Sequence, residues 1–171
     1  MSFASQPFGT PSQAAASPTG AFLLRPMIQE IVNLTATTIP EHVAADAPLI
    51  LIDVDRSHTV DADTASVRRV LGTLIRDAVA AAAGPLAASD APALREVVIT
   101  SIQTADAIEI EIADSSATSV DTIGMATAAA ESMISRLGGT LRVYRCPEGG
   151  KAVTMSLPRR QVATAAIRRA A

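Results

Sequence analysis

The sequence predicts an α+β fold, an α/β sandwich in which a mixed, mostly antiparallel sheet carries its helices on one face. Two observations support this prediction. Segments with apolar residues at helical spacing are interleaved with runs that alternate apolar and polar residues, as strands do. In one such run, Ile108, Ile110 and Ile112 face away from Glu109 and Glu111, which is typical of a sheet with one wet face.

The composition is that of one domain with a core of small and branched aliphatic residues. The chain has 171 residues, of which 49% are hydrophobic and only 2% aromatic. A net charge of −3 argues against a nucleic acid or an anionic membrane as partner. The single cysteine, Cys146, excludes an intrachain disulfide. Since no apolar run has the length of a membrane span and no signal-peptide pattern occurs, we expect a cytoplasmic protein.

We divide the chain into three parts. Residues 1–20 carry no charge and are rich in Ser, Ala, Gly and Pro, which favours a flexible leader. Residues 21–158 are predicted to form the folded domain. Residues 159–171 contain four arginines and no acid. We expect them to form a basic C-terminal tail, either solvated or docked on a partner as an amphipathic helix.

The first half of the domain is predicted to begin with a short edge strand at 21–25 and a helix over about 27–38. Pro40 ends this helix, because the residue before a proline is pushed out of the helical region. Residues 49–55 have the branched apolar content of a strand. The residues between this strand and the next helix are expected to form a solvated connection.

A central helix is predicted between Asp63 and Pro85. Asp63 or Thr64 supplies its N-cap, and Gly84 with Pro85 ends it. Its apolar stripe consists of Val67, Val70, Leu71, Leu74, Ile75, Ala78 and Ala82. Three arginines lie off this stripe and are expected to contact solvent: Arg68, Arg69 and Arg76.

The second half of the domain is predicted to contain two pairs of strands and one helix. The strands of the first pair are joined by a tight polar turn at Thr104 and Ala105. The predicted elements are strands at 96–103 and 106–113, a helix at about 124–137, and strands at 140–145 and 151–157.

Three segments, taken in order, have the spacing of motifs in a known family. DTASVRRVLGTLIRDA begins at Asp63, AIEIEIADSSATS contains Asp114, and GMATAAAESMISRLGG precedes the hairpin strands TLRVYR and VTMSLP. Together they resemble the ATP-binding domain of histidine kinases, the GHKL or Bergerat fold shared with gyrase, mismatch-repair and heat-shock ATPases. The resemblance runs from about Phe22 to Pro158.

The resemblance implies a nucleotide site that uses ATP and magnesium. Asp77 stands where the family has the asparagine that coordinates magnesium. A carboxylate is a suitable magnesium ligand, but it adds negative charge beside the phosphates. Asp114 keeps the aspartate that accepts a hydrogen bond from the adenine amino group. Gly124 keeps the first glycine of the G-L-G-L-A box, and helix amides at 124–127 are suited to hold an anion.

Other positions depart from the family pattern. The earlier asparagine of the helix motif is Thr73, and the basic residue after it is Ala80. Only nine residues separate Asp114 from Gly124, so the nucleotide lid is expected to be truncated. Where a glycine would permit close backbone approach, side chains stand at three positions of the cofactor-binding boxes: Ser116, Thr118 and Ala126.

Other sites are weaker candidates. His42 and His58 lack the helical setting of a phosphorylatable histidine, so autophosphorylation is not expected. No Cys and His residues have the spacing of a zinc site. Four acids form a patch that either binds a cation or, in the commoner case, is a solvated connection: Asp53, Asp55, Asp61 and Asp63.

These features predict a degenerate histidine-kinase-like domain, a pseudokinase of bacterial two-component signal transduction that acts by protein contacts. Its partner would be a protein such as a response regulator or a kinase, and ATP turnover is not expected. The alternative is a histidine kinase or anti-sigma-type kinase domain that still binds Mg-ATP through Asp77, Asp114 and Gly124. A third interpretation is a structural or dimerising module.

Overall fold

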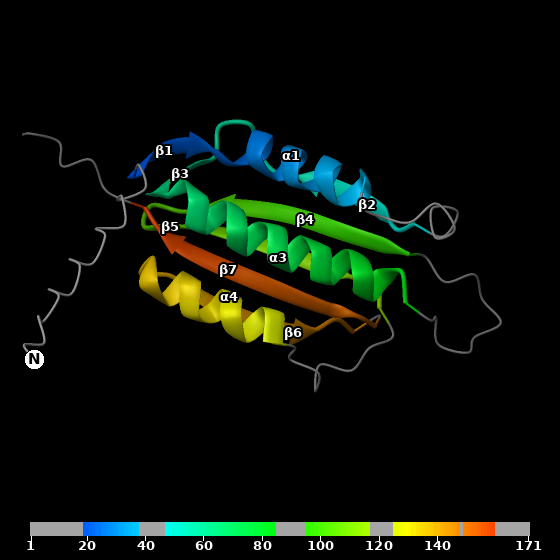
Figure 1. Ribbon diagram of the computed structural model, residues 1–171. Helices are drawn as coiled ribbons and strands as arrows, with labels where there is room; N and C mark the ends of the chain where they lie inside the picture. Colours follow the sequence, from blue (N-terminus) through cyan, green and yellow to red (C-terminus); the bar gives the residue numbers. More distant parts are fainter. Residues whose placement is uncertain (1–18, 38–46, 85–94, 117–124, 148, 160–171) are drawn as a thin grey trace, which may run out of the picture.

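The computed structural model describes residues 19–37, 47–84, 95–116, 125–147 and 149–159. They form a five-stranded sheet, a separate two-stranded sheet and three helices. The helices lie side by side across one face of the larger sheet (Figure 1). This arrangement confirms the predicted α/β sandwich. Residues 1–18 of the predicted leader and 160–171 of the predicted tail lie outside the described residues. The edge strand predicted at 21–25 is shifted: it covers Thr19–Leu23, and Leu24 already begins the first helix.

The five-stranded sheet is mixed, as predicted. Its strands, in spatial order, are β2 (Leu49–Asp53), β4 (Glu96–Gln103), β5 (Ala107–Asp114), β7 (Lys151–Pro158) and β6 (Thr140–Arg145). Strands β2 and β4 are parallel, and every other neighbouring pair is antiparallel. The three helices are α1 (Leu24–Thr37), α3 (Thr64–Ala82) and α4 (Met125–Arg136).

The smaller sheet corrects the prediction for the residues before α3. Strand β1 (Thr19–Leu23) pairs antiparallel with β3 (Thr59–Asp63), where a solvated connection was expected. The sequence signal of β3 is weak, because two of its five residues are aspartates and only Val60 is a branched apolar residue. Pairing with β1, which places Val60 opposite Phe22, supplies the backbone hydrogen bonds that the local sequence does not predict.

The hydrophobic core lies between the helices and the large sheet. Helix α3 is central: it contacts α1, α4 and β5. All seven residues of its predicted apolar stripe are buried, and so are Gly72 and Val79. The opposing surface is formed by inward-facing residues of β5 and β7, namely Ile108, Ile110, Ile112, Val153, Met155 and Leu157. Of the helices in the described segments, none combines the length and apolar character that a membrane crossing requires.

Asp63 caps α3, and its loss is expected to destabilise the domain. The side chain accepts a hydrogen bond from the Ser66 backbone N–H, with N and Oδ2 3.0 Å apart. We expect Asp63→Ala to lower the free energy of unfolding by about 1 kcal/mol in urea titration, whereas Asp63→Asn keeps an acceptor and most of the stability. Asp61→Ala, two residues earlier on the same strand, is the matched control. Equal losses in Asp61→Ala and Asp63→Ala would contradict the capping role.

Candidate functional site

Asp114 is a buried carboxylate at the end of β5. It continues the inward alternation of Ile108, Ile110 and Ile112, so its side chain points toward the helices and is only 1% exposed. Its Oδ1 accepts a hydrogen bond from the backbone N–H of Ser116, at an N–O distance of 3.0 Å. Ser116 is also buried, and its Oγ makes no hydrogen bond to any described residue.

Lys151 lies directly opposite Asp114 on β7 and is not among the site residues that the sequence predicts. The two residues are register partners in the β5–β7 pair. The Lys151 Nζ lies 2.9 Å from Asp77 Oδ2 and 3.8 Å from Asp114 Oδ2. The two predicted acids, Asp77 on α3 and Asp114 on β5, therefore both lie within ion-pair distance of the Lys151 ammonium group.

A sequence signal for Lys151 does exist. Val153, Met155 and Leu157 are the inward-facing residues of β7, and the same alternation extended two residues toward the N-terminus reaches Lys151. That periodicity predicts an inward-pointing lysine at the strand end. A charged residue there requires a partner, because an unpaired charge at a buried position is unfavourable.

The charges at this site are partly shielded from solvent. The Lys151 side chain is 14% exposed and the Asp77 side chain 34% exposed. The ammonium donates a hydrogen bond to Asp77 and lies at longer range from the more deeply buried Asp114. Reduced solvent screening strengthens these attractions relative to an ion pair on the surface. The cluster has one positive and two negative groups, so it has no spare positive charge for a phosphate.

The backbone at Gly150, just before β7, closely approaches the end of β5 beside the site. Gly150 has a φ of +83°, and a Cβ on it would overlap the carbonyl oxygen of Asp114. Gly149, also at positive φ, donates its N–H to the Cys146 carbonyl in the preceding turn. Glycine is therefore required at Gly150 for two reasons, its backbone conformation and the space that it leaves for the neighbouring strand.

The remaining predicted site residues either lie outside the described residues or make contacts elsewhere. Thr118 and Gly124, and with them most of the predicted short lid, lie outside the described residues. Ala126 lies in the first turn of α4, but its side chain is not described. Thr73, on α3, donates its hydroxyl to the Arg69 carbonyl within the same helix. His42 is also outside the described residues.

Asp55, one of the four acids of the patch before α3, accepts local hydrogen bonds. Asp55 Oδ1 accepts from the Ser57 hydroxyl at 2.6 Å and from the Ser57 backbone N–H at 2.7 Å, and these bonds lower the pKa of Asp55. Within the described ranges, no group of three or more His, Cys, Asp or Glu residues is arranged to hold a metal ion. His58 lies just before β3 and is half-buried. Its Nδ1 is within hydrogen-bond distance of Ser101 Oγ on β4, at 2.7 Å.

The cluster around Lys151 does not fit the magnesium that the family resemblance implies. A metal ion on Asp77 would have to share that carboxylate with the Lys151 ammonium, which lies 2.9 Å from Oδ2. Two cations on one carboxylate repel each other. The adenine position fits better: Asp114 Oδ2 is buried and makes no hydrogen bond among the described residues. It could therefore accept one from an amino group.

Comparison with known proteins identifies the fold. No model of a known protein family and no curated protein sequence matches the chain. The nucleotide-free catalytic domain of the histidine kinase ThkA matches with 15% identity and a TM-score of 0.65, over 82% of this chain and 97% of that chain.

Two further histidine kinases match at similar levels. The Acinetobacter baumannii histidine kinase AdeS has 16% identity and a TM-score of 0.64, over 85% of this chain and 70% of that chain. The mycobacterial sensor histidine kinase MprB has 14% identity and a TM-score of 0.63, over 82% and 97%. The described chain therefore has the GHKL-type ATPase fold of histidine kinase catalytic domains.

Proposed function

We propose that this chain is a degenerate histidine-kinase-like domain of bacterial signal transduction that acts through protein contacts and not through ATP chemistry. The supporting observation is the ion pair between Lys151 Nζ and Asp77 Oδ2 at 2.9 Å. By resemblance, Asp77 stands at the magnesium position. Its carboxylate is already neutralised by a cation that belongs to the chain itself.

Binding of Mg-ATP at this site would carry two energetic penalties. The first is a weakened or lost Lys151–Asp77 ion pair, because a metal ion would compete with the partly buried ammonium for the Asp77 carboxylate. The second penalty is steric. The buried side chain of Ser116 stands where, by resemblance, the family has a glycine that lets the backbone approach the ligand. Both penalties support a role that does not need the nucleotide.

The proposed partner is a protein of a two-component system, such as a response regulator or a kinase. The matched structures are histidine kinases by name, which supports this class of pathway. The chain's own residues favour contact over catalysis, because two residues of the family's helix motif are replaced. Thr73 stands in place of the earlier asparagine, and Ala80 in place of the basic residue that follows the motif.

Titration with a fluorescent ATP analogue tests the proposal. We expect the full chain to show no binding at millimolar nucleotide, with or without magnesium, because Lys151 competes for Asp77. A well-characterised histidine kinase catalytic domain serves as the positive control, and chain unfolded in urea reports nonspecific signal. Micromolar binding that Asp114→Ala abolishes would contradict the proposal.

The alternative function, a domain that still binds nucleotide, has one observation in its favour. Asp114 Oδ2 and Ser116 Oγ are two buried oxygens without a hydrogen-bond partner among the described residues. Buried polar atoms usually have partners, so these two are suited to a ligand with amino groups. Adenosine without phosphates distinguishes the cases: binding that does not depend on magnesium and is lost in Asp114→Ala would support a remaining base pocket.

A further inference from the structure

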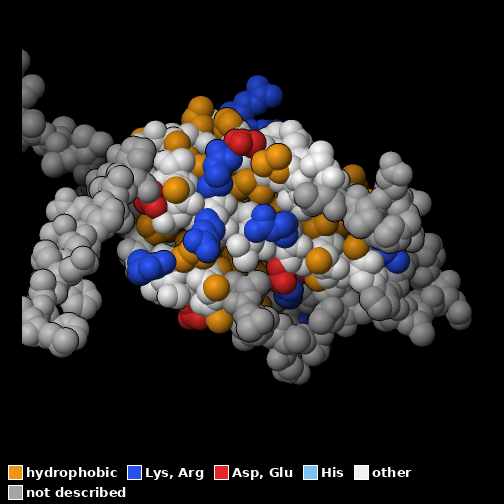
Figure 2. Space-filling view, in the orientation of Figure 1, with side chains coloured by type: hydrophobic (Ala, Val, Ile, Leu, Met, Phe, Trp, Pro, Cys, Tyr) orange, Lys and Arg blue, Asp and Glu red, His pale blue; other side chains and the backbone are white. Residues whose placement is uncertain are grey.

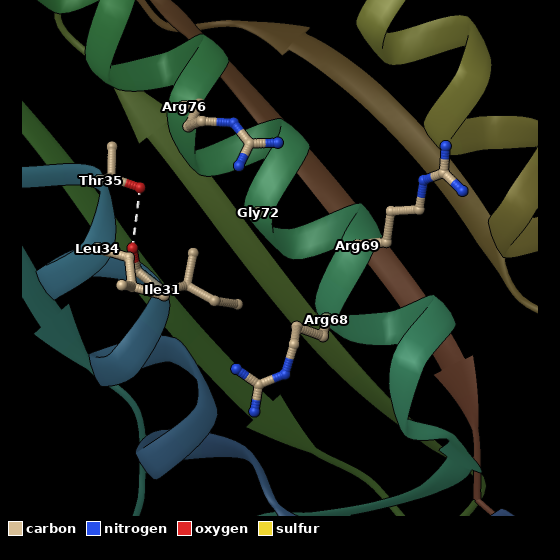
Figure 3. A pocket seen from close by; sticks show the side chains of 7 residues that line it. All are labelled: Ile31, Leu34, Thr35, Arg68, Arg69, Gly72 and Arg76. Atoms are coloured by element: carbon tan, nitrogen blue, oxygen red, sulfur yellow. Dashed lines mark hydrogen bonds between the residues drawn. The ribbon is translucent and has the colours of Figure 1, made fainter. Parts of the chain in front are cut away.

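A groove between α1 and α3 combines an apolar surface with three arginines. It is lined by Ile31, Leu34 and Thr35 of α1 and by Arg68, Arg69, Gly72 and Arg76 of α3, and it encloses about 340 Å³. We call these seven residues the arginine groove. Figure 3 shows Ile31 pointing toward α3 and Arg68 reaching toward α1, whereas Arg69 extends from the side of α3 that faces away from α1. The three arginines are accessible to solvent, as predicted, and they also border this cavity.

Gly72 keeps the groove open without a structural need for glycine. It is not among the glycines with positive φ, and a Cβ on it would meet only Arg76 Nη1 at 3.6 Å and Ile31 Cγ2 at 3.9 Å. Both are ordinary van der Waals distances. Since a glycine in a helix interior is less stable than alanine, the sequence retains a destabilising residue where a side chain would fit. The missing side chain leaves room beside Ile31.

The charges of the groove are mostly uncompensated. Arg68 forms an ion pair with Glu30, with Nη1 and Oε1 2.8 Å apart, and both side chains are substantially exposed. Arg69 and Arg76 form no ion pair with any residue that the structure describes. Arg68, Gly72 and Arg76 follow one another at intervals of four residues and so share one face of α3. The groove is thus a positive surface on a chain of net charge −3.

The surface around the groove is also both basic and apolar. Figure 2 shows basic side chains spread over the face formed by the helices, with hydrophobic side chains and a smaller number of acidic ones between them. Leu34 at the edge of the groove is 59% exposed, so its apolar side chain is accessible to a partner beside the three arginines. Apolar surface bordered by polar and charged side chains is typical of a protein contact site.

We propose that the arginine groove binds an acidic amphipathic segment of a partner protein. An apolar side chain of the partner enters the space above Gly72 and contacts Ile31 and Leu34. One carboxylate of the segment binds Arg76 beside this space, and another binds Arg69 on the far side of α3, so the segment lies across the helix. Arginine suits this role because its planar guanidinium donates two parallel hydrogen bonds to a carboxylate. The apolar lining and the acidic chain disfavour a nucleic acid.

The arginine groove would be a contact surface for the proposed function, and this inference rests on that function only in taking protein contact to be the role of the chain. The residues involved are separate from the nucleotide cluster. Asp77 follows Arg76 but points toward β7, where it accepts a hydrogen bond from Lys151. Nucleotide titration therefore tests one proposal and peptide binding the other, and either can fail alone.

The test uses the full chain and a fluorescent 16-residue helical peptide with leucines on one face and glutamates on the other. Fluorescence anisotropy is expected to show binding that weakens about tenfold in Arg76→Glu and further in the double variant with Arg69→Glu. Gly72→Leu, which fills the cavity without removing charge, is expected to reduce binding to a similar extent. Arg136→Glu on α4 is the matched charge reversal outside the groove and is expected to leave the affinity nearly unchanged.

Several outcomes would overturn the inference. A scrambled peptide of the same composition that binds equally well would show charge attraction alone. Equal weakening in Arg136→Glu, or unchanged binding in Gly72→Leu, would place the contact elsewhere. Stronger competition by DNA or anionic vesicles than by unlabelled peptide would assign the groove to another class of partner. A dimer in size-exclusion chromatography that Arg76→Glu dissociates would make a second copy of the chain the occupant.

Discussion

Replacing Lys151 by methionine is expected to lower the free energy of unfolding by about 3 kcal/mol. The substitution keeps a long aliphatic side chain but removes the ammonium beside Asp114 and Asp77. Asp114, whose side chain is 1% exposed, would then lose its ion pair with Lys151, which is the one that the described residues supply within 4 Å. A buried charge without its partner accounts for most of the loss, and the magnitude lies at the low end because Lys151 is itself partly exposed. Urea unfolding monitored by circular dichroism measures this change.

A second substitution tests whether charge is the cause. In Lys151→Met combined with Asp114→Asn, the buried charge is removed, while the asparagine side-chain oxygen can still accept the Ser116 N–H. We expect this double variant to recover much of the lost stability, so that the double-mutant cycle gives a clear coupling energy. A loss below about 0.5 kcal/mol in Lys151→Met would show that the ammonium is not needed to balance Asp114. It would also weaken the case that Lys151 blocks the magnesium position.

Replacing Gly150 by alanine is expected to destabilise the domain by about 3 kcal/mol or more, through strain and steric overlap together. The glycine has a φ of +83°, and an added Cβ would overlap the Asp114 carbonyl oxygen and lie 2.8 Å from its carbonyl carbon. Relief requires β7 to move away from β5, which weakens the strand pair that positions Lys151 opposite Asp114. Thermal unfolding and amide hydrogen exchange along β5 and β7 measure both effects.

Gly149 provides a matched control in the same turn. Its φ is +104°, but a Cβ there would have no atom within 4 Å. Gly149→Ala therefore carries the conformational penalty without the overlap, and a loss of about 1–2 kcal/mol is expected. The difference between the two variants measures the contact with Asp114. Equal losses would show that the turn shifts to accommodate the side chain at Gly150.

Local periodicity was sufficient to predict most of the elements. The apolar stripe of α3 and the alternation of β5 are strong patterns that persist over many residues, and both are confirmed. The capping role of Asp63 is also confirmed, because a cap depends only on neighbouring backbone. Strand β3 was missed, since its pairing with β1 joins segments about 40 residues apart and overrides a poor local propensity.

The two acids of the candidate site were identified by resemblance, but their relationship was not. Asp77 and Asp114 were assigned separate roles, toward a metal and a base. The structure joins them through Lys151, which belongs to a strand whose register with β5 is set by the whole hairpin. The arginine groove was likewise not predicted, because Arg76 and Ile31 are adjacent only after α1 packs against α3.

The sequence by itself determined the helices, the five strands of the large sheet, the fold that they form, and the two carboxylates at its candidate site. These depend on patterns that repeat within one segment or on motifs spaced along the chain. The tertiary structure alone decided what those carboxylates contact and where the arginines lie. The reason is physical: an ion pair between Lys151 and Asp77, or a cavity beside Gly72, depends on the packing of segments that are distant in the chain.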